Sequence, residues 1–127
     1  MRVTSISLRV GLVLGSIAMA ASAHAQDAAK GKAVFARCGM CHGTDGTPHM
    51  GPDLKTVYGR KAGTLAGYNY SPAMKGEAVA WDDKALDSFV TAPRTMVPGT
   101  KMAFPGVSNP ADRSNLIAYL KSLKSAK

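Results

Sequence analysis

The chain has 127 residues, a length that fits one domain and leaves no room for a second. It carries 16 basic and 8 acidic residues, for a net charge of +8, which suits either simple solubility or attraction to an acidic partner. Only 6% of the residues are aromatic, so a core made from side chains alone would be modest. A buried cofactor would supply the missing apolar surface.

Residues 1–25 predict a signal peptide. Arg2 and Arg9 form a positive amino-terminal region, and Val10 to Ala21 is an apolar run of 12 residues. Ser22-Ala23-His24-Ala25 then provides the small residues of a signal-peptidase site. The alternative is an uncleaved anchor, but crossing the hydrocarbon core takes about 20 apolar residues. No other segment of the chain could span a membrane.

Cleavage after Ala25 would release a mature domain of residues 26–127 into the periplasm. This domain keeps both cysteines, 14 basic residues and all 8 acidic residues, so its net charge is +6. Asp27 predicts the N-cap of a first helix, in which Val34, Phe35 and Cys38 fall at helical spacing.

Cys38-Gly39-Met40-Cys41-His42 is the attachment signature of a c-type haem. Each thiol adds to one vinyl group of the porphyrin, and the adjacent histidine is held where it can ligate the iron. A disulfide would close a very small strained loop, and redox-active pairs of this spacing belong to a βαβ context that this chain lacks. A zinc site needs four ligands, and only the distant His49 could join these three.

Loops and a short helix follow the signature. Gly43 to Pro52 and Lys55 to Tyr70 are rich in turn-forming residues and predict loops. Ser71 and Pro72 then predict a helix start, with serine as N-cap and proline in the first helical position. Gly76 ends this helix after about one turn.

Two longer helices complete the prediction. Asp82 caps the first, with apolar residues at i, i+3 and i+4, and Pro93 ends it. Residues 94–108 predict a second long loop, and Asn109-Pro110 opens the last helix. Its apolar stripe consists of Leu116, Ile117, Leu120 and Leu123. The prediction is therefore one all-α domain, with helices at both termini, short central helices and long loops around one covalent haem.

The sixth iron ligand is the choice that separates an electron carrier from a ligand binder or a catalyst. The mature chain offers six candidates: Met40, His49, Met50, Met74, Met96 and Met102. Met40 lies inside the attachment loop, and His49 and Met50 follow His42 too closely to cross easily to the far face. Met74 sits in the short helix. Met102 lies in an extended loop that could drape over the far face, so loop reasoning favours it without excluding the others, because any methionine can simply fill core space.

Further segments of the mature chain form a pattern together with the haem signature. They are Gly31-Lys32 with Phe35, Gly51 to Leu54, Tyr58 to Gly63, Gly67 to Ser71, Trp81, Pro98 to Phe104, and Leu116 to Leu120. On these residues, the chain resembles a class I cytochrome c of the mitochondrial and short bacterial kind over residues 27–126. The segment from Pro98 to Met102 is far more specific than the haem signature, which many unrelated proteins share.

The resemblance implies particular roles for the site residues. Cys38 and Cys41 would carry the haem, and His42 and Met102 would be the axial ligands of its iron. Pro52 would accept the histidine N–H through its carbonyl group. The haem propionates would be partnered by Arg60, Tyr70 and Trp81, and the methionine loop would be ordered by the hydroxyl of Thr100. The crossing of the terminal helices would be formed by Gly31, Phe35, Leu116 and Tyr119.

The chain also departs from the family pattern. Phe89 stands where many relatives have tyrosine, and Met74 stands where an asparagine is common, which predicts a drier distal pocket with a shifted reduction potential. The loop from His42 to Gly51 is about two residues shorter than in the mitochondrial form. Lysines typical of partner docking are missing around Ser108-Asn109. Matches to docking positions are nevertheless kept at Arg37, Arg94 and Lys101.

The resulting hypothesis is a soluble periplasmic electron carrier and not an enzyme. It would exchange single electrons with a membrane bc-type complex and a terminal oxidase, peroxidase or reaction centre, as a monomer that binds no nucleic acid. It would touch the membrane only through those complexes. One rival hypothesis is a peroxidase or ligand sensor with Met102 off the iron. The other is a thiol–disulfide oxidoreductase that uses Cys38 and Cys41.

Overall fold

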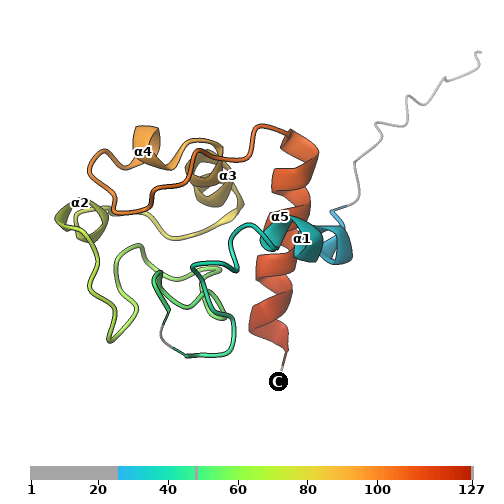
Figure 1. Cartoon of the computed structure of the whole chain (residues 1–127), viewed down its shortest axis with the longest axis horizontal. Helices are drawn as coiled ribbons and strands as arrows, with labels where there is room; N and C mark the ends of the chain where they lie inside the picture. Colours follow the sequence, from blue (N-terminus) through green and yellow to red (C-terminus); the bar gives the residue numbers. More distant parts are fainter. Residues whose placement is uncertain (1–25, 48, 127) are drawn as a thin grey trace, which may run out of the picture.

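The computed structural model describes residues 26–47 and 49–126, and the predicted signal peptide lies outside this part of the chain. Five helices are present: α1 (Ala28–Phe35), α2 (Pro72–Lys75), α3 (Asp83–Thr91), α4 (Pro93–Met96) and α5 (Pro110–Ser125). Helix α1 crosses α5 on one side of the molecule, while α3 and α4 lie along one edge and long loops fill the opposite edge (Figure 1). The described residues form no strand, so the predicted all-α architecture is confirmed.

Four of the helices begin where the sequence predicts, because a side chain caps each start. The Asp27 carboxylate accepts hydrogen bonds from Ala29 N and Lys30 N at 2.9 and 3.0 Å. Capping of this kind satisfies backbone N–H groups that have no partner inside the helix. The caps of the other three helices are Ser71, Asp82 and Asn109.

Helix α4 was not predicted, since its residues fall in the stretch expected to be a loop. Ala92 is its N-cap residue and makes no side-chain hydrogen bond to the helix, so the sequence carries no capping signal. Pro93 both ends α3 and occupies the first turn of α4. Val97, directly after α4, is fully buried, which indicates that tertiary packing holds this turn in place.

The two terminal helices pack together through a glycine. Gly31 is buried in α1, and a Cβ atom at this position would overlap the Asn115 carbonyl and lie 2.8 Å from the Tyr119 Cβ. The Phe35 and Tyr119 rings lie 5.1 Å apart beside this crossing, and the Asp27 N–H donates to Asn115 Oδ1 at 2.9 Å. The helix crossing implied by the family resemblance is therefore present.

Charged side chains tie α5 to the central part of the chain. Arg113 donates to the Asp87 carboxylate at 2.7 Å and to the carbonyls of Val107 and Ser108 at 3.0 and 2.9 Å. Lys121 contacts the Asp83 carboxylate at 2.7 Å. Since Asp83 and Asp87 belong to α3, these contacts fix the distance between α3 and α5.

The loops from residues 53 to 81 are closed by a short antiparallel pairing. An isolated bridge joins Lys61 to Ala80, and the neighbouring bonds run from Ala62 N to Val79 O and from Trp81 N to Arg60 O, at 2.9 and 3.0 Å. The sequence did not predict this pairing. It holds Arg60 and Trp81 side by side.

Among the described residues, no helix is long and apolar enough to cross a membrane.

We expect Gly31→Ala to lower the free energy of unfolding by about 1–3 kcal/mol or more, because the new methyl group would collide with the α5 backbone. Gly39→Ala is the matched control, since a Cβ there would meet the Phe35 ring at an ordinary 3.5 Å. Denaturant unfolding of the two variants measures the difference. Equal stability would show that the crossing of α1 and α5 tolerates a side chain.

Candidate cofactor site

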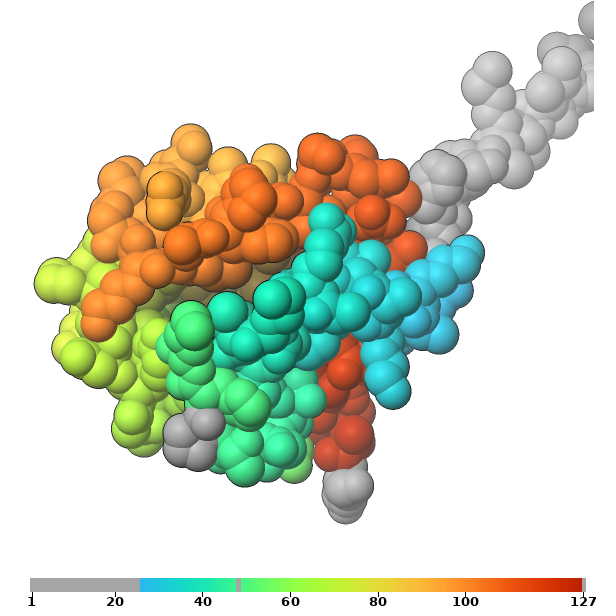
Figure 2. Space-filling model, viewed as in Figure 1, coloured from blue at the N-terminus to red at the C-terminus, as the bar shows by residue number. Residues whose placement is uncertain are grey.

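A cavity of about 450 Å³ lies in the middle of the molecule. Its lining comes from four helices (α1, α2, α3 and α5) and from the loops between them, and most of the lining side chains are apolar. Figure 2 shows the hollow between the segment that carries residues near 100 and the segment that carries residues near 40. The two sequence regions with the strongest predicted roles therefore face each other across this cavity.

The signature Cys38 to His42 forms one wall. Backbone hydrogen bonds from Cys41 N and His42 N to the Cys38 carbonyl, at 3.0 and 2.9 Å, fold the segment into a tight turn directly after α1. Cys38, Cys41 and His42 are half-buried, and all three line the cavity. The local turn thus brings two thiols and one imidazole to the same surface.

The orientation of His42 is fixed by the loop that follows it. Its Nδ1 lies 2.8 Å from the Pro52 carbonyl oxygen, which can only accept, so Nδ1 carries the hydrogen and Nε2 is left with a free lone pair. A Cβ at Gly51 would lie 2.6 Å from the imidazole Cε1, so only glycine lets the loop approach this closely. The predicted hydrogen bond to Pro52 is confirmed.

The protonation state of His42 suits a metal ligand. Burial lowers the pKa of the imidazole, because the charged form loses hydration, and the hydrogen bond to Pro52 only partly offsets this. The ring is therefore neutral near pH 7. A neutral imidazole whose second nitrogen is held by a carbonyl is the usual form of a histidine that binds a metal ion.

Met102 lies in the opposite wall. Its backbone N–H donates to Thr100 Oγ1 at 3.3 Å, so the predicted contact of Thr100 with the methionine loop is present. Lys101 anchors the same loop by donating to the Asn69 carbonyl at 2.9 Å. Gly99 takes a φ of 92°, which is the turn that lets this loop bend back over the cavity.

The structure narrows the six candidates for a sixth ligand to three. Only Met50, Met74 and Met102 line the cavity, whereas Met40, His49 and Met96 do not. His49 is exposed and instead lies 3.0 Å from Thr47 Oγ1 through its Nε2. Met50 contacts Cys41 at 3.8 Å between the two sulfur atoms, so it belongs to the wall that carries His42.

Arg60 provides an independent indication of what the cavity holds. Its two terminal nitrogens donate to Thr56 Oγ1 and to the Asp53 carbonyl at 3.1 and 3.3 Å, but its buried Nε has no partner. Arg60 lines the cavity together with Tyr70 and Trp81. A buried donor without an acceptor costs about 1–3 kcal/mol, so the cavity calls for an acidic group beside Arg60.

The residues present therefore fit a haem. The cavity offers two thiols, a neutral imidazole, thioethers on either side, an apolar lining and a guanidinium for the acidic edge of the ring. Two of the lining residues are Met74 and Phe89, both 8% exposed, and neither side chain brings a hydrogen-bond donor. That these side chains make the distal pocket drier stays a prediction.

The thiols do not show the features of a redox-active pair. Burial raises the pKa of the Cys38 thiol, whereas reactive cysteines have a lowered pKa and partial thiolate character. The described part of the chain also holds no cluster of three or more histidine, cysteine or acidic side chains that could bind a metal ion. The arrangement favours covalent attachment of a cofactor over thiol–disulfide exchange.

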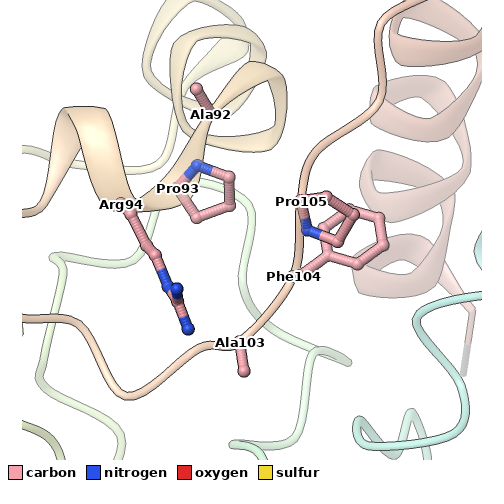
Figure 3. A pocket seen from close by; sticks show the side chains of 6 residues that line it. All are labelled: Ala92, Pro93, Arg94, Ala103, Phe104 and Pro105. Carbon is pink, nitrogen blue, oxygen red and sulfur yellow. The ribbon is translucent and has the colours of Figure 1, made fainter.

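A second, smaller pocket of about 250 Å³ lies on the surface between the start of α4 and residues 103–105. Figure 3 shows Arg94 reaching from α4 toward Ala103, with Phe104 and Pro105 on the other side.

The three predicted docking cations are exposed, and two of them, Arg37 and Lys101, also line the large cavity. Two of the three cations thus lie at the large cavity, and Arg94 lies at the smaller pocket.

Comparison with known proteins agrees with this site. The family model for cytochrome c matches residues 28–124. Cytochrome c2 of Rhodomicrobium vannielii is 42% identical over 90% of this chain and 94% of its own length. Cytochrome c of Euglena viridis is 48% identical over 77% of this chain and 98% of its own length.

A solved structure gives the same result. Cytochrome cH from Methylobacterium extorquens is 44% identical and superimposes with a TM-score of 0.73, covering 76% of this chain and 98% of that one. Together with the central cavity and its cysteine and histidine wall, these matches show that the chain belongs to the cytochrome c family, binds one haem c covalently and carries electrons.

Proposed function

We propose that this protein is a periplasmic electron carrier whose haem is attached through Cys38 and Cys41 and ligated by His42 and Met102. The observation that carries the proposal is the geometry of the central cavity. One wall presents a neutral imidazole with Nε2 free, and the facing wall presents a thioether on an anchored loop. Both axial positions would then be filled by protein side chains, which leaves no open site for a substrate.

Haem c supplies an iron that alternates between Fe(III) and Fe(II), one electron at a time. The hydrogen bond from His42 to Pro52 makes the imidazole a better donor and prevents it from rotating. The methionine thioether is a neutral ligand, and His/Met ligation is the arrangement that raises the reduction potential in cytochromes c. His42 and Met102 would hold the iron in both oxidation states, so little of the structure would have to move.

The walls of the cavity determine the polarity and the charge of the surroundings of a bound haem. Apolar side chains from four helices form most of the lining, so a haem bound there would lie in a largely apolar environment. The Arg60 guanidinium would pair with a propionate, and Tyr70 and Trp81 lie on the same lining. Since an ionised carboxylate is costly to bury alone, the guanidinium would allow a propionate to stay charged inside the protein.

Exposed cations near the opening would guide redox partners to it. Arg37, Arg94 and Lys101 are exposed. A partner with an acidic face would be attracted at long range, and added salt would slow the encounter. The partners we propose are a membrane bc-type complex as donor and a terminal oxidase, peroxidase or photosynthetic reaction centre as acceptor.

We expect Met102→Ala to keep the haem attached but to abolish the methionine–iron charge-transfer band of the oxidised protein, because the sixth position opens. The variant should become high-spin and bind cyanide or CO readily. A redox titration with optical spectra measures both ligation and potential. Met96→Ala is the matched control, since Met96 packs against the core without lining the cavity.

The opposite result would redirect the ligand assignment. An unchanged band in Met102→Ala, with loss of the band in Met50→Ala or Met74→Ala, would place the iron ligand on another wall of the cavity. If the unmodified protein binds cyanide readily, that result would favour the hypothesis of a peroxidase or a ligand sensor.

We expect Arg60→Gln to make the reduction potential depend on pH near neutrality. Without the guanidinium, the pKa of the adjacent propionate rises, so that group ionises as the pH increases through the new pKa. The added negative charge favours Fe(III), so the potential should fall with rising pH. Arg60→Lys keeps the charge and should behave more like the unmodified protein; an identical flat profile in all three would remove Arg60 from the propionate site.

We expect export to remove residues 1–25. The protein recovered from the periplasm of a Gram-negative host that matures c-type haems should begin at Gln26, as measured by intact mass with one haem added. Changing Ala23 and Ala25 to Lys should block cleavage, because the peptidase site needs small residues. Full-length protein held in the membrane of the unmodified strain would instead indicate an anchor.

A further inference from the structure

Two methionines differ from the rest in their exposure to solvent. Met40 and Met50 are 83% and 80% exposed, and they are the large apolar side chains that stand out on the surface of the described residues. Met74 is only 8% exposed, and Met96 and Met102 are half-buried. An exposed large apolar side chain lowers solubility and adds nothing to the core, so two of them close together in the chain call for a reason.

Both exposed methionines lie beside the attachment cysteines. Met40 stands between Cys38 and Cys41, and it does not line the cavity, so its exposure does not depend on what fills the cavity. The Met50 sulfur lies 3.8 Å from the Cys41 sulfur at the edge of the cavity. The Tyr68 hydroxyl donates to the Met50 carbonyl at 3.1 Å, which fixes the backbone at this point.

We propose that Met40 and Met50 form a peroxide-reactive pair that takes up hydroperoxides before Met102 does, and so protects the proposed iron ligand. In each reaction the thioether sulfur attacks one oxygen of the hydroperoxide. The O–O bond breaks, an S–O bond forms, and the proton of the attacked oxygen moves to the leaving oxygen. The sulfur loses two electrons, and the peroxide is reduced to water or an alcohol. The product is a methionine sulfoxide, which reductases can restore.

The expected order of reaction follows from burial. Susceptibility to oxidation increases with exposure, so an oxidant from solvent meets Met40 and Met50 first. A sulfoxide at either position would have its polar oxygen in water. A sulfoxide at Met74 or Met102 would put that oxygen against the apolar lining of the cavity, where a polar group without a partner is costly.

The protective role rests on the proposed ligation by Met102, whereas the order of oxidation does not. The test treats the oxidised holoprotein with limiting hydrogen peroxide and locates the added oxygen by peptide mass spectrometry. Met40, which does not line the cavity, should be oxidised about tenfold faster than Met74, in line with their exposed fractions, and Met50 at the cavity edge should also react before Met74. Oxidation of Met74 or Met102 at the same rate as Met40 and Met50, or faster, would overturn the proposal.

A paired variant tests the protection itself. In Met40→Leu with Met50→Leu, apolar side chains of similar size replace the thioethers, so the fold should be kept. The methionine–iron charge-transfer band should then disappear at a lower peroxide dose, by about two equivalents per protein, one for each thioether removed. If the band disappears at the same peroxide dose as in the unmodified protein, the proposed protection of Met102 is wrong.

The matched control is Met96→Leu, which removes a methionine away from the cavity and should leave the dose unchanged. If the band is missing before any peroxide is added, the ligation by Met102 is wrong. The mass spectrometry would still decide whether Met40 and Met50 react first.

Discussion

The rest of the structure depends on a central cavity that the chain's own side chains do not fill. Most of the lining of this cavity is apolar, and apolar surface left in contact with water costs about 25 cal/mol per Å². A chain with so few aromatic residues therefore relies on its haem as the middle of its core, and four helices and the long loops are arranged as a shell around it.

The shell is held together mainly by the two ends of the chain. Helices α1 and α5 cross at Gly31, where only a residue without a side chain fits against the Asn115 carbonyl. This contact fixes the turn that carries Cys38, Cys41 and His42, because that turn follows α1 directly. The clamps from α5 to α3, through Arg113 and Lys121, then fix the far side of the cavity. The position of the haem-binding wall is thus set by contacts between segments about 80 residues apart.

Polar groups are few around the cavity, and each has a definite role. Pro52 accepts the Nδ1 hydrogen of His42, which leaves Nε2 with a free lone pair. The Nε of Arg60 is buried and lacks a partner, which marks the place of an acidic group. Most of the remaining lining is apolar, and Met74 and Phe89 add no donor. The environment favours fixed ligation and single-electron exchange over substrate chemistry, in agreement with membership of the cytochrome c family.

The amino-acid sequence by itself determined the features that depend on neighbouring residues. Asp27, Ser71, Asp82 and Asn109 cap helices within three residues of themselves, and the segment from Cys38 to His42 folds into a single turn, so these features follow from spacing alone. Helix α4 and the Lys61–Ala80 bridge could not be predicted, because packing and not a local signal stabilises them. The choice among six possible sixth ligands also needed the tertiary structure, since whether a methionine faces the cavity depends on how distant segments pack. The fold keeps Met40, His49 and Met96 out of the lining and leaves the Arg60 Nε buried without a partner, because side-chain direction is decided only when α1, α3 and α5 close around the same space.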